Sequence, residues 1–86
     1  DERVVNTDAV FIAVGTTPRS NVLKAAGVAI NKAGYAIAGE SGATNVPGVF
    51  VAGDVREKPL RQVITAASDG ANAATAAFEY LNLGCF

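Results

Sequence analysis

The pair Gly53-Asp54 is the strongest candidate for chemistry in this sequence of 86 residues. It closes the apolar stretch 48–53, which predicts a strand buried on both faces of an α/β sheet. In open α/β sheets, ligands bind beyond the carboxyl ends of the strands. Gly53 would let a ligand approach the backbone, and Asp54 would offer a carboxylate to ligand hydroxyl groups. The alternative is an ordinary turn, in which Asp54 only caps the loop.

A second candidate is the segment Arg61-Gln62-Val63, which opens a predicted helix over 61–83. Apolar residues recur there at three- and four-residue spacing and predict one apolar stripe: Val63, Ile64, Ala67, Ala71, Ala74, Phe78 and Leu81. The first turn of a helix has unpaired N–H groups and a partial positive charge, which suit an electron-rich ligand. The alternative is a solvated first turn, with Val63 in the core.

Further elements must position these residues. The apolar run 8–14, closed by Gly15, predicts another buried strand. Ser20 is a candidate N-cap for a short helix that Gly27 ends. Short extended pieces at 28–30 and 35–38 flank a predicted turn at 31–34. Tyr35 and Tyr80 are interpreted as half-buried structural residues, Asp69-Gly70 as packing, and Gly70 as a place where another backbone comes close. The chain is expected to form one unit over 1–86.

Composition excludes several classes of protein. The net charge is −1, without a basic stripe, which argues against a nucleic-acid partner. No apolar run is long enough to cross a bilayer, so we expect no membrane partner and a cytoplasmic location. The chain has no His and one Cys, Cys85, so neither a Cys-x-x-Cys pair nor a catalytic thiolate is expected. No catalytic or metal-binding residue is assigned.

Three segments together resemble one family. The stretch Thr44-Asn45-Val46-Pro47-Gly48-Val49-Phe50-Val51-Ala52-Gly53-Asp54 resembles the Thr-x-x-Pro-Gly-x-Phe-x-x-Gly-Asp signature of two-domain FAD and NAD(P)H disulfide oxidoreductases. Arg61-Gln62 is similar to the Arg-Gln segment of thioredoxin reductases, and Val14-Gly15-Thr16-Thr17-Pro18 to the loop where the chain re-enters their FAD domain. The sequence therefore resembles the C-terminal segment of the FAD-binding domain of a thioredoxin-reductase-like flavoprotein.

The resemblance implies a Rossmann-like, three-layer α/β domain, of which this chain would be a part. It implies that Gly53 and Asp54 contact the ribityl chain of FAD, and that Arg61, Gln62 and Val63 lie at the isoalloxazine edge. A helix terminus there would stabilise the negative charge of the reduced flavin. Thr16 and Gly15 are expected on the nucleotide side of the loop.

Parts of such an enzyme are missing from the sequence. It contains neither a Gly-x-Gly-x-x-Gly turn for a dinucleotide nor a Cys-x-x-Cys pair. We therefore expect a fragment or excised segment of such an enzyme, inactive alone and retaining little FAD. Its partners would be the rest of the FAD domain, an NAD(P)H domain that takes NADPH, and a thioredoxin-like disulfide substrate. The alternative is a non-catalytic isolated or engineered α/β half-domain that self-associates as a homo-oligomer.

Overall fold

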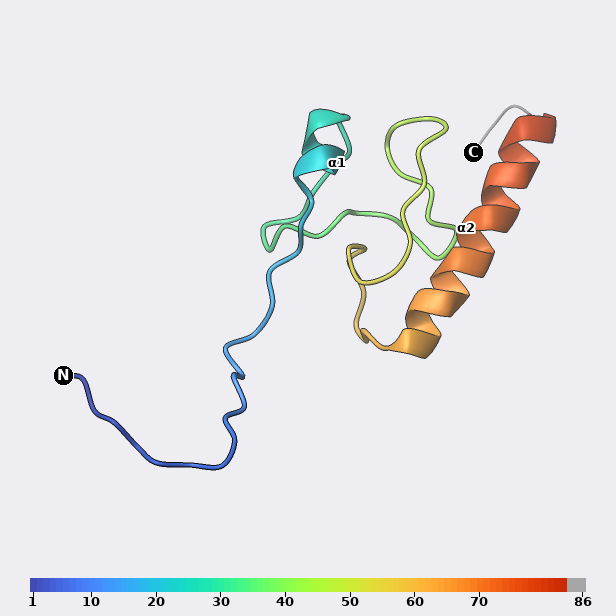
Figure 1. The fold of residues 1–86 in the computed structure, drawn as a ribbon. Coiled ribbons are helices and arrows are strands. Elements are labelled where there is room, and N and C mark those ends of the chain that lie inside the picture. The colour runs from blue at the N-terminus through green and yellow to red at the C-terminus, as the bar shows by residue number, and fades with distance from the viewer. Residues whose placement is uncertain (84–86) are drawn as a thin grey trace.

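A computed structural model describes residues 1–83 and contains two helices, α1 (Asn21–Ala25) and α2 (Val63–Leu83). The first 14 residues form an extended arm that leads away from a compact body (Figure 1). Within the body, α2 flanks the irregular segments 28–60 along its length (Figure 1). Cys85 lies outside the described residues. Among those described, no helix is both long and apolar enough to cross a membrane.

The short helix α1 forms where the sequence predicts it. The Ser20 carbonyl accepts the N–H groups of Leu23 and Lys24, at 3.1 and 3.0 Å, and starts the helix. The Ser20 side chain makes no capping hydrogen bond, so only its position as N-cap is confirmed. Gly27 ends the helix with a φ of +87°, a conformation that favours glycine.

Isolated backbone bridges replace regular strands in the body. Ile30 pairs with Ala36 in antiparallel fashion, as the predicted turn at 31–34 requires, and Ala36 pairs in parallel with Arg56. The Ala36 N–H donates to the Val55 carbonyl at 2.8 Å. Around these bridges a small core of Val28, Ala36 and Val51 is buried. The pairing of Ala36 with Arg56 thus places the loop 53–58 beside residues 36–40.

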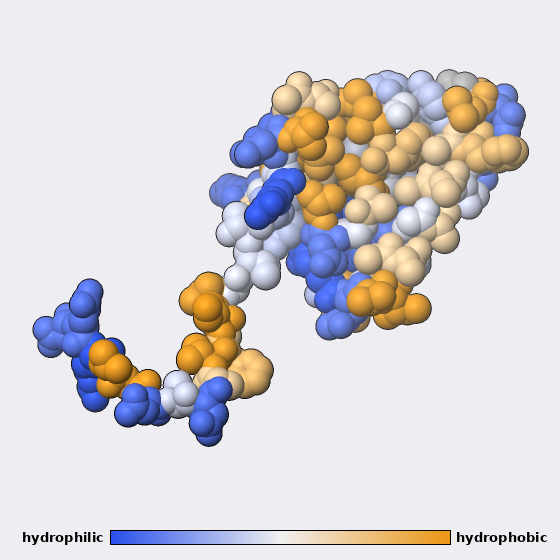
Figure 2. Space-filling view, in the orientation of Figure 1, coloured by the Kyte–Doolittle hydropathy of each residue, from blue (hydrophilic) through white to orange (hydrophobic). Residues whose placement is uncertain are grey.

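The predicted buried strand over 8–14 is wrong for this structure. Phe11 and Ile12 are 94% and 83% exposed, and the segment is extended but unpaired (Figure 2, apolar side chains along the arm). A buried strand needs neighbouring strands on its edges and layers on both faces, and no described segment lies there. The strand over 48–53 is likewise reduced to one bridge, between Ala43 and Phe50, although Val51 is buried. Whether the exposed apolar side chains drive self-association stays a prediction.

Helix α2 confirms the predicted helix, but a different face of it packs. The side chains that face the body are Ala66, Asp69, Ala73, Ala76 and Tyr80. The predicted stripe is exposed instead, with Val63 at 89% and Leu81 at 81%. Alanines occur on both faces of this helix, and small side chains let the loops approach closely. Tyr80 anchors the far end through an edge-to-face contact with Phe50, 6.1 Å between ring centroids.

Gly70 does not mark a close backbone approach, contrary to the prediction. A Cβ added there would meet nothing within 4 Å, and the residue is exposed in the middle of α2. Gly70→Ala is therefore expected to raise the free energy of unfolding by about 0.5–1 kcal/mol, because alanine loses less backbone entropy in a helix. Urea unfolding followed by helical circular dichroism measures the change. Unchanged or lower stability would contradict the open environment of this position.

Candidate functional site

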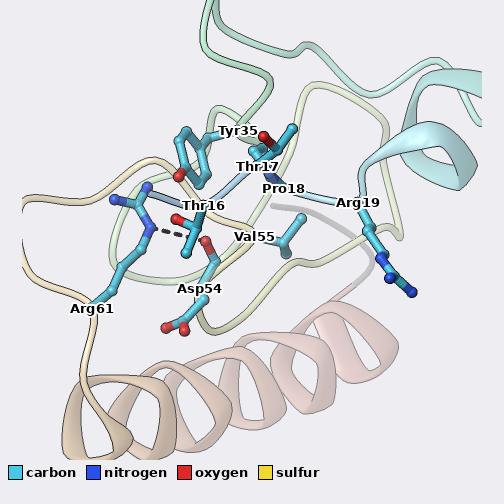
Figure 3. Close-up of a pocket in the computed structure, with 8 residues that line it drawn as sticks. All are labelled: Thr16, Thr17, Pro18, Arg19, Tyr35, Asp54, Val55 and Arg61. Carbon is cyan, nitrogen blue, oxygen red and sulfur yellow. Dashed lines mark hydrogen bonds between the residues drawn. The ribbon is translucent and has the colours of Figure 1, made fainter. Parts of the chain in front are cut away.

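A pocket of about 330 Å³ lies between the end of the arm and the loop 54–61. Figure 3 shows three separate segments forming it: residues 16–19, Tyr35, and the loop that precedes α2. The residues that line the pocket are Thr16, Thr17, Pro18, Arg19, Tyr35, Asp54, Val55 and Arg61. The structure thus brings Asp54, Arg61 and Thr16 to one place, although up to 45 residues separate them in the sequence.

Arg61 forms one wall of this pocket and is held by its own chain. Its Nε donates to the Asp54 carbonyl oxygen at 3.0 Å, and its Nη2 donates to the Arg56 carbonyl oxygen at 3.2 Å. The guanidinium lies over the Tyr35 ring, 3.7 Å from the ring centroid, which adds a cation–π attraction. These contacts fix the guanidinium as a flat, positively charged wall (Figure 3).

Asp54 is the acidic residue among those that line the pocket. The side chain is exposed, and in the described part of the chain no hydrogen bond or ion pair engages it. In Figure 3 the carboxylate points away from the Arg61 guanidinium, while the Asp54 carbonyl oxygen accepts the bond from Arg61. Gly53, just before it, has a φ of +86°, which a residue with a Cβ rarely adopts. The turn thus presents two carboxylate oxygens that can accept hydrogen bonds.

The other three predicted residues do not line the pocket: Gly53 precedes Asp54 in the turn, and Gln62 and Val63 lie at the start of α2. The Gln62 N–H donates to the Thr65 Oγ1 at 2.9 Å, and the Gln62 carbonyl accepts the Ala66 N–H at 3.0 Å. Gln62 therefore occupies the N-cap position, and both side chains are exposed. The first turn of the helix still carries N–H groups that have no partner within the helix. A ligand-binding role for Gln62 and Val63 stays a prediction.

Beside the turn that carries Gly53 and Asp54 lies a buried ionic cluster. It is made of Asp69 on α2 and of Arg56 and Lys58 on the loop before α2. Asp69 Oδ2 accepts from Arg56 Nε at 3.0 Å and from Lys58 Nζ at 2.6 Å, and Asp69 Oδ1 accepts from Arg56 Nη2 at 3.1 Å. The same Oδ2 accepts the Gly53 N–H at 3.0 Å. The side chains are only 3–6% exposed. The pKa of Asp69 is held well below its ordinary value, mainly by the hydrogen bonds from Arg56. Burial acts in the opposite direction and raises this pKa, but by less.

Sequence reasoning missed this cluster and the role of Tyr35. Tyr35 is half-buried, as predicted, but it also lies under Arg61 in the pocket wall. The sequence alone indicates only a packing role for Asp69. A signal existed for it: Asp69 is the one charged residue on a helix face otherwise built from Ala66, Ala73 and Ala76. A lone carboxylate on a face of small apolar residues predicts a buried cationic partner.

Comparisons with known proteins show which family the chain resembles. A family model described as pyridine nucleotide-disulphide oxidoreductase matches residues 1–70. The chain is 48% identical over 75 residues to a thioredoxin reductase of Peptoclostridium acidaminophilum, covering 87% of this chain and 24% of the relative. It is 41% identical over 81 residues to an alkyl hydroperoxide reductase subunit of Staphylococcus epidermidis, covering 94% of this chain and 16% of the relative.

Solved structures show the same likeness. A crystal structure of Lactococcus lactis thioredoxin reductase, in the FR conformation, superposes with a TM-score of 0.76 at 40% identity, covering 84% of this chain and 23% of that one. A thioredoxin reductase from Streptococcus pyogenes gives a TM-score of 0.75 at 39% identity. These likenesses are consistent with the predicted Rossmann-like class, and they confirm the resemblance to thioredoxin-reductase-like flavoproteins. The chain spans about a quarter or less of these relatives, and it belongs to the pyridine nucleotide-disulphide oxidoreductase family.

Proposed function

We propose that this chain supplies the ribityl and isoalloxazine side of the FAD site in an FAD-dependent NAD(P)H:disulfide oxidoreductase of the thioredoxin reductase type. One observation carries the proposal: Asp54, Arg61 and Thr16, from three separate motifs of the sequence, line one pocket. Residues 1–86 would act as one unit of the FAD domain. Its partners would be the rest of that domain, an NAD(P)H domain and a thioredoxin-like disulfide.

The chemistry of the pocket fits this part of FAD. Its volume of about 330 Å³ lies at the lower end for ligand pockets, which suits one portion of a dinucleotide rather than the whole. Asp54 provides an acceptor without a competing partner in the described chain, which suits a polyhydroxyl chain. Gly53 adopts the positive φ of the turn, which a residue with a Cβ rarely does, while Val55 and Pro18 provide apolar wall.

In this proposal the residues bind and orient, and FAD, when bound, supplies the hydride and electron transfer chemistry. The Asp54 carboxylate would accept hydrogen bonds from ribityl hydroxyl groups. Val63 would offer its N–H group at the start of α2, and Gln62 its exposed side-chain amide, to the electron-rich edge of the isoalloxazine. Arg61, held flat against Tyr35, would keep the wall of the pocket in place.

Asp54→Ala is expected to weaken FAD binding about tenfold, because a hydrogen-bond acceptor that carries charge contributes roughly 1.5–3 kcal/mol. Quenching of flavin fluorescence during titration with the chain gives the dissociation constant, at chain concentrations high enough for weak binding. The stability should change little, since the Asp54 side chain is exposed.

Asp8→Ala is the matched control, because Asp8 is an exposed carboxylate on the arm, outside the pocket. It removes the same charge, so it should leave the FAD dissociation constant within about twofold. Equal affinities for wild type and Asp54→Ala would remove Asp54 from the site. Equal losses of FAD affinity in both variants would show that the change in net charge, and not the loss of Asp54 itself, weakens binding.

A further inference from the structure

The turn that carries Asp54 is fastened to α2 by one carboxylate, that of Asp69. Within the turn, the Arg56 N–H donates to the Gly53 carbonyl oxygen at 3.1 Å and closes residues 53–56 on themselves. On its other side, the Gly53 N–H donates to Asp69 Oδ2 at 3.0 Å. The Asp69 carboxylate therefore holds the peptide group between Ala52 and Gly53, one residue before Asp54.

We infer that Asp69 is a positioning residue for FAD, which acts through the Gly53 N–H to hold Asp54 at its place in the pocket. The inference rests on the proposed function, because it assumes that Asp54 contacts FAD. Asp69 lies six residues into α2, about 9 Å along the helix from Val63. A single carboxylate thus sets the distance between the Asp54 turn and the first turn of α2, the two places proposed to contact one flavin.

The remaining contacts of the cluster make Asp69 rigid enough for this role. Arg56 binds both carboxylate oxygens of Asp69, which fixes the plane of the carboxylate. Lys58 adds a third cationic contact from the loop and lies 3.4 Å from the Thr65 carbonyl oxygen, in the first turn of the helix. Arg56 also donates to the Ala38 carbonyl oxygen at 3.1 Å, so the cluster is tied to the body.

A neutral side chain of the same shape tests the inference. Asp69→Asn keeps one acceptor oxygen but turns an NH₂ group toward donors on Arg56 and Lys58, so the side chain cannot keep its present orientation. We expect FAD to bind about tenfold more weakly. In ¹⁵N-labelled protein without FAD, we expect the Gly53 amide proton to move upfield and to exchange faster, because it loses a charged acceptor. A general loss of stability would not single out this one resonance.

Two further variants separate positioning from stability. Val28→Ala weakens the core away from the cluster and should leave FAD affinity within about twofold in the folded protein. Asp69→Glu keeps the negative charge for Arg56 and Lys58 but moves the carboxylate one methylene outward, away from its position under Gly53. If Asp69→Asn does not fold, Asp69→Glu should still displace the Gly53 resonance and lower FAD affinity about fivefold.

The outcomes keep this inference apart from the proposed function. Weaker FAD binding by Asp54→Ala, together with wild-type affinity in an Asp69 variant whose Gly53 resonance has moved, would overturn the positioning role alone. An unmoved Gly53 resonance in Asp69→Asn would also overturn it. Wild-type affinity in Asp54→Ala would instead remove the proposed site itself.

Discussion

Arg56→Met is expected to lower the free energy of unfolding by about 3 kcal/mol, because it leaves the buried Asp69 carboxylate with Lys58 as its only cationic partner. Methionine fills similar space but donates no hydrogen bond, so the Ala38 carbonyl oxygen also loses its donor. For a chain of this length the total is roughly 4–13 kcal/mol, so the loss is a large share of it. Urea unfolding measured by circular dichroism gives the difference.

Acid provides an independent check of the same contact. Because the pKa of Asp69 in the folded chain lies below its ordinary value of 3.8, its stabilising effect is fully present above that value. The effect is lost as pH falls below 3.8 toward the folded pKa. Arg56→Met removes the main cause of the lowered pKa, so the variant should lose less stability between pH 7 and pH 3 than the wild type.

Arg3→Met serves as the control for charge, since Arg3 is exposed on the arm. It should change the free energy of unfolding by less than about 0.5 kcal/mol. Equal losses in Arg3→Met and Arg56→Met would show that net charge, not the buried cluster, sets the stability. The same acid sensitivity in Arg56→Met and wild type would show that Arg56 does not hold the Asp69 carboxylate.

Gly42→Ala is expected to destabilise the chain by about 2–4 kcal/mol, through backbone strain and a steric clash together. Gly42 has a φ of +77°, which disfavours any residue with a Cβ. An added Cβ would lie 2.5 Å from the Val51 carbonyl oxygen and 3.2 Å from the Ala73 Cβ on α2. The backbone cannot yield easily, because the Val51 N–H donates to the Gly42 carbonyl oxygen at 2.8 Å. Thermal unfolding measures the effect as a lower midpoint.

Gly39→Ala is a matched control three residues away. A Cβ at Gly39 would meet nothing within 4 Å, and its φ lies outside the region that favours glycine. It should therefore leave the midpoint unchanged or raise it slightly, since alanine restricts the unfolded chain more than glycine. Equal midpoints for Gly42→Ala and Gly39→Ala would contradict the close packing of Gly42 against Val51 and α2.

Local signals in the sequence predicted the parts of the fold that local interactions determine. Helix α2 follows from its alanine content, α1 from Ser20 and Gly27, and the turn at 31–34 from Asn31 and Gly34. Asn31 closes that turn, because its Oδ1 accepts the N–H groups of Ala33 and Tyr35. These contacts span four residues or fewer, so the residue types alone indicate them.

Contacts between distant segments were predicted poorly. The apolar run 8–14 has the composition of a buried strand, but burial depends on layers that no described residues form. The packed face of α2 was wrong because alanines on both faces leave the helical period ambiguous. The Asp69 cluster joins residues 11 to 16 apart in the sequence, and spacing alone does not show which cation meets which carboxylate.

Part of the candidate site was predictable and part was not. Asp54 and Arg61, which two motifs of the sequence single out, line one pocket with Thr16. Gln62 and Val63 stand beside the pocket at the helix start without lining it. Tyr35 joins the pocket because its ring lies against the Arg61 guanidinium, a contact between distant residues that no pattern in the sequence indicates.

The most direct test maps where FAD contacts the ¹⁵N- and ¹³C-labelled chain by intermolecular nuclear Overhauser effects, at flavin concentrations that drive weak binding toward saturation. We predict contacts from ribityl protons to the Gly53-Asp54 turn, and from isoalloxazine protons to the first turn of α2. Saturable binding with all contacts elsewhere on the chain, or no saturable binding at any concentration, would contradict the proposal that these two places hold one flavin.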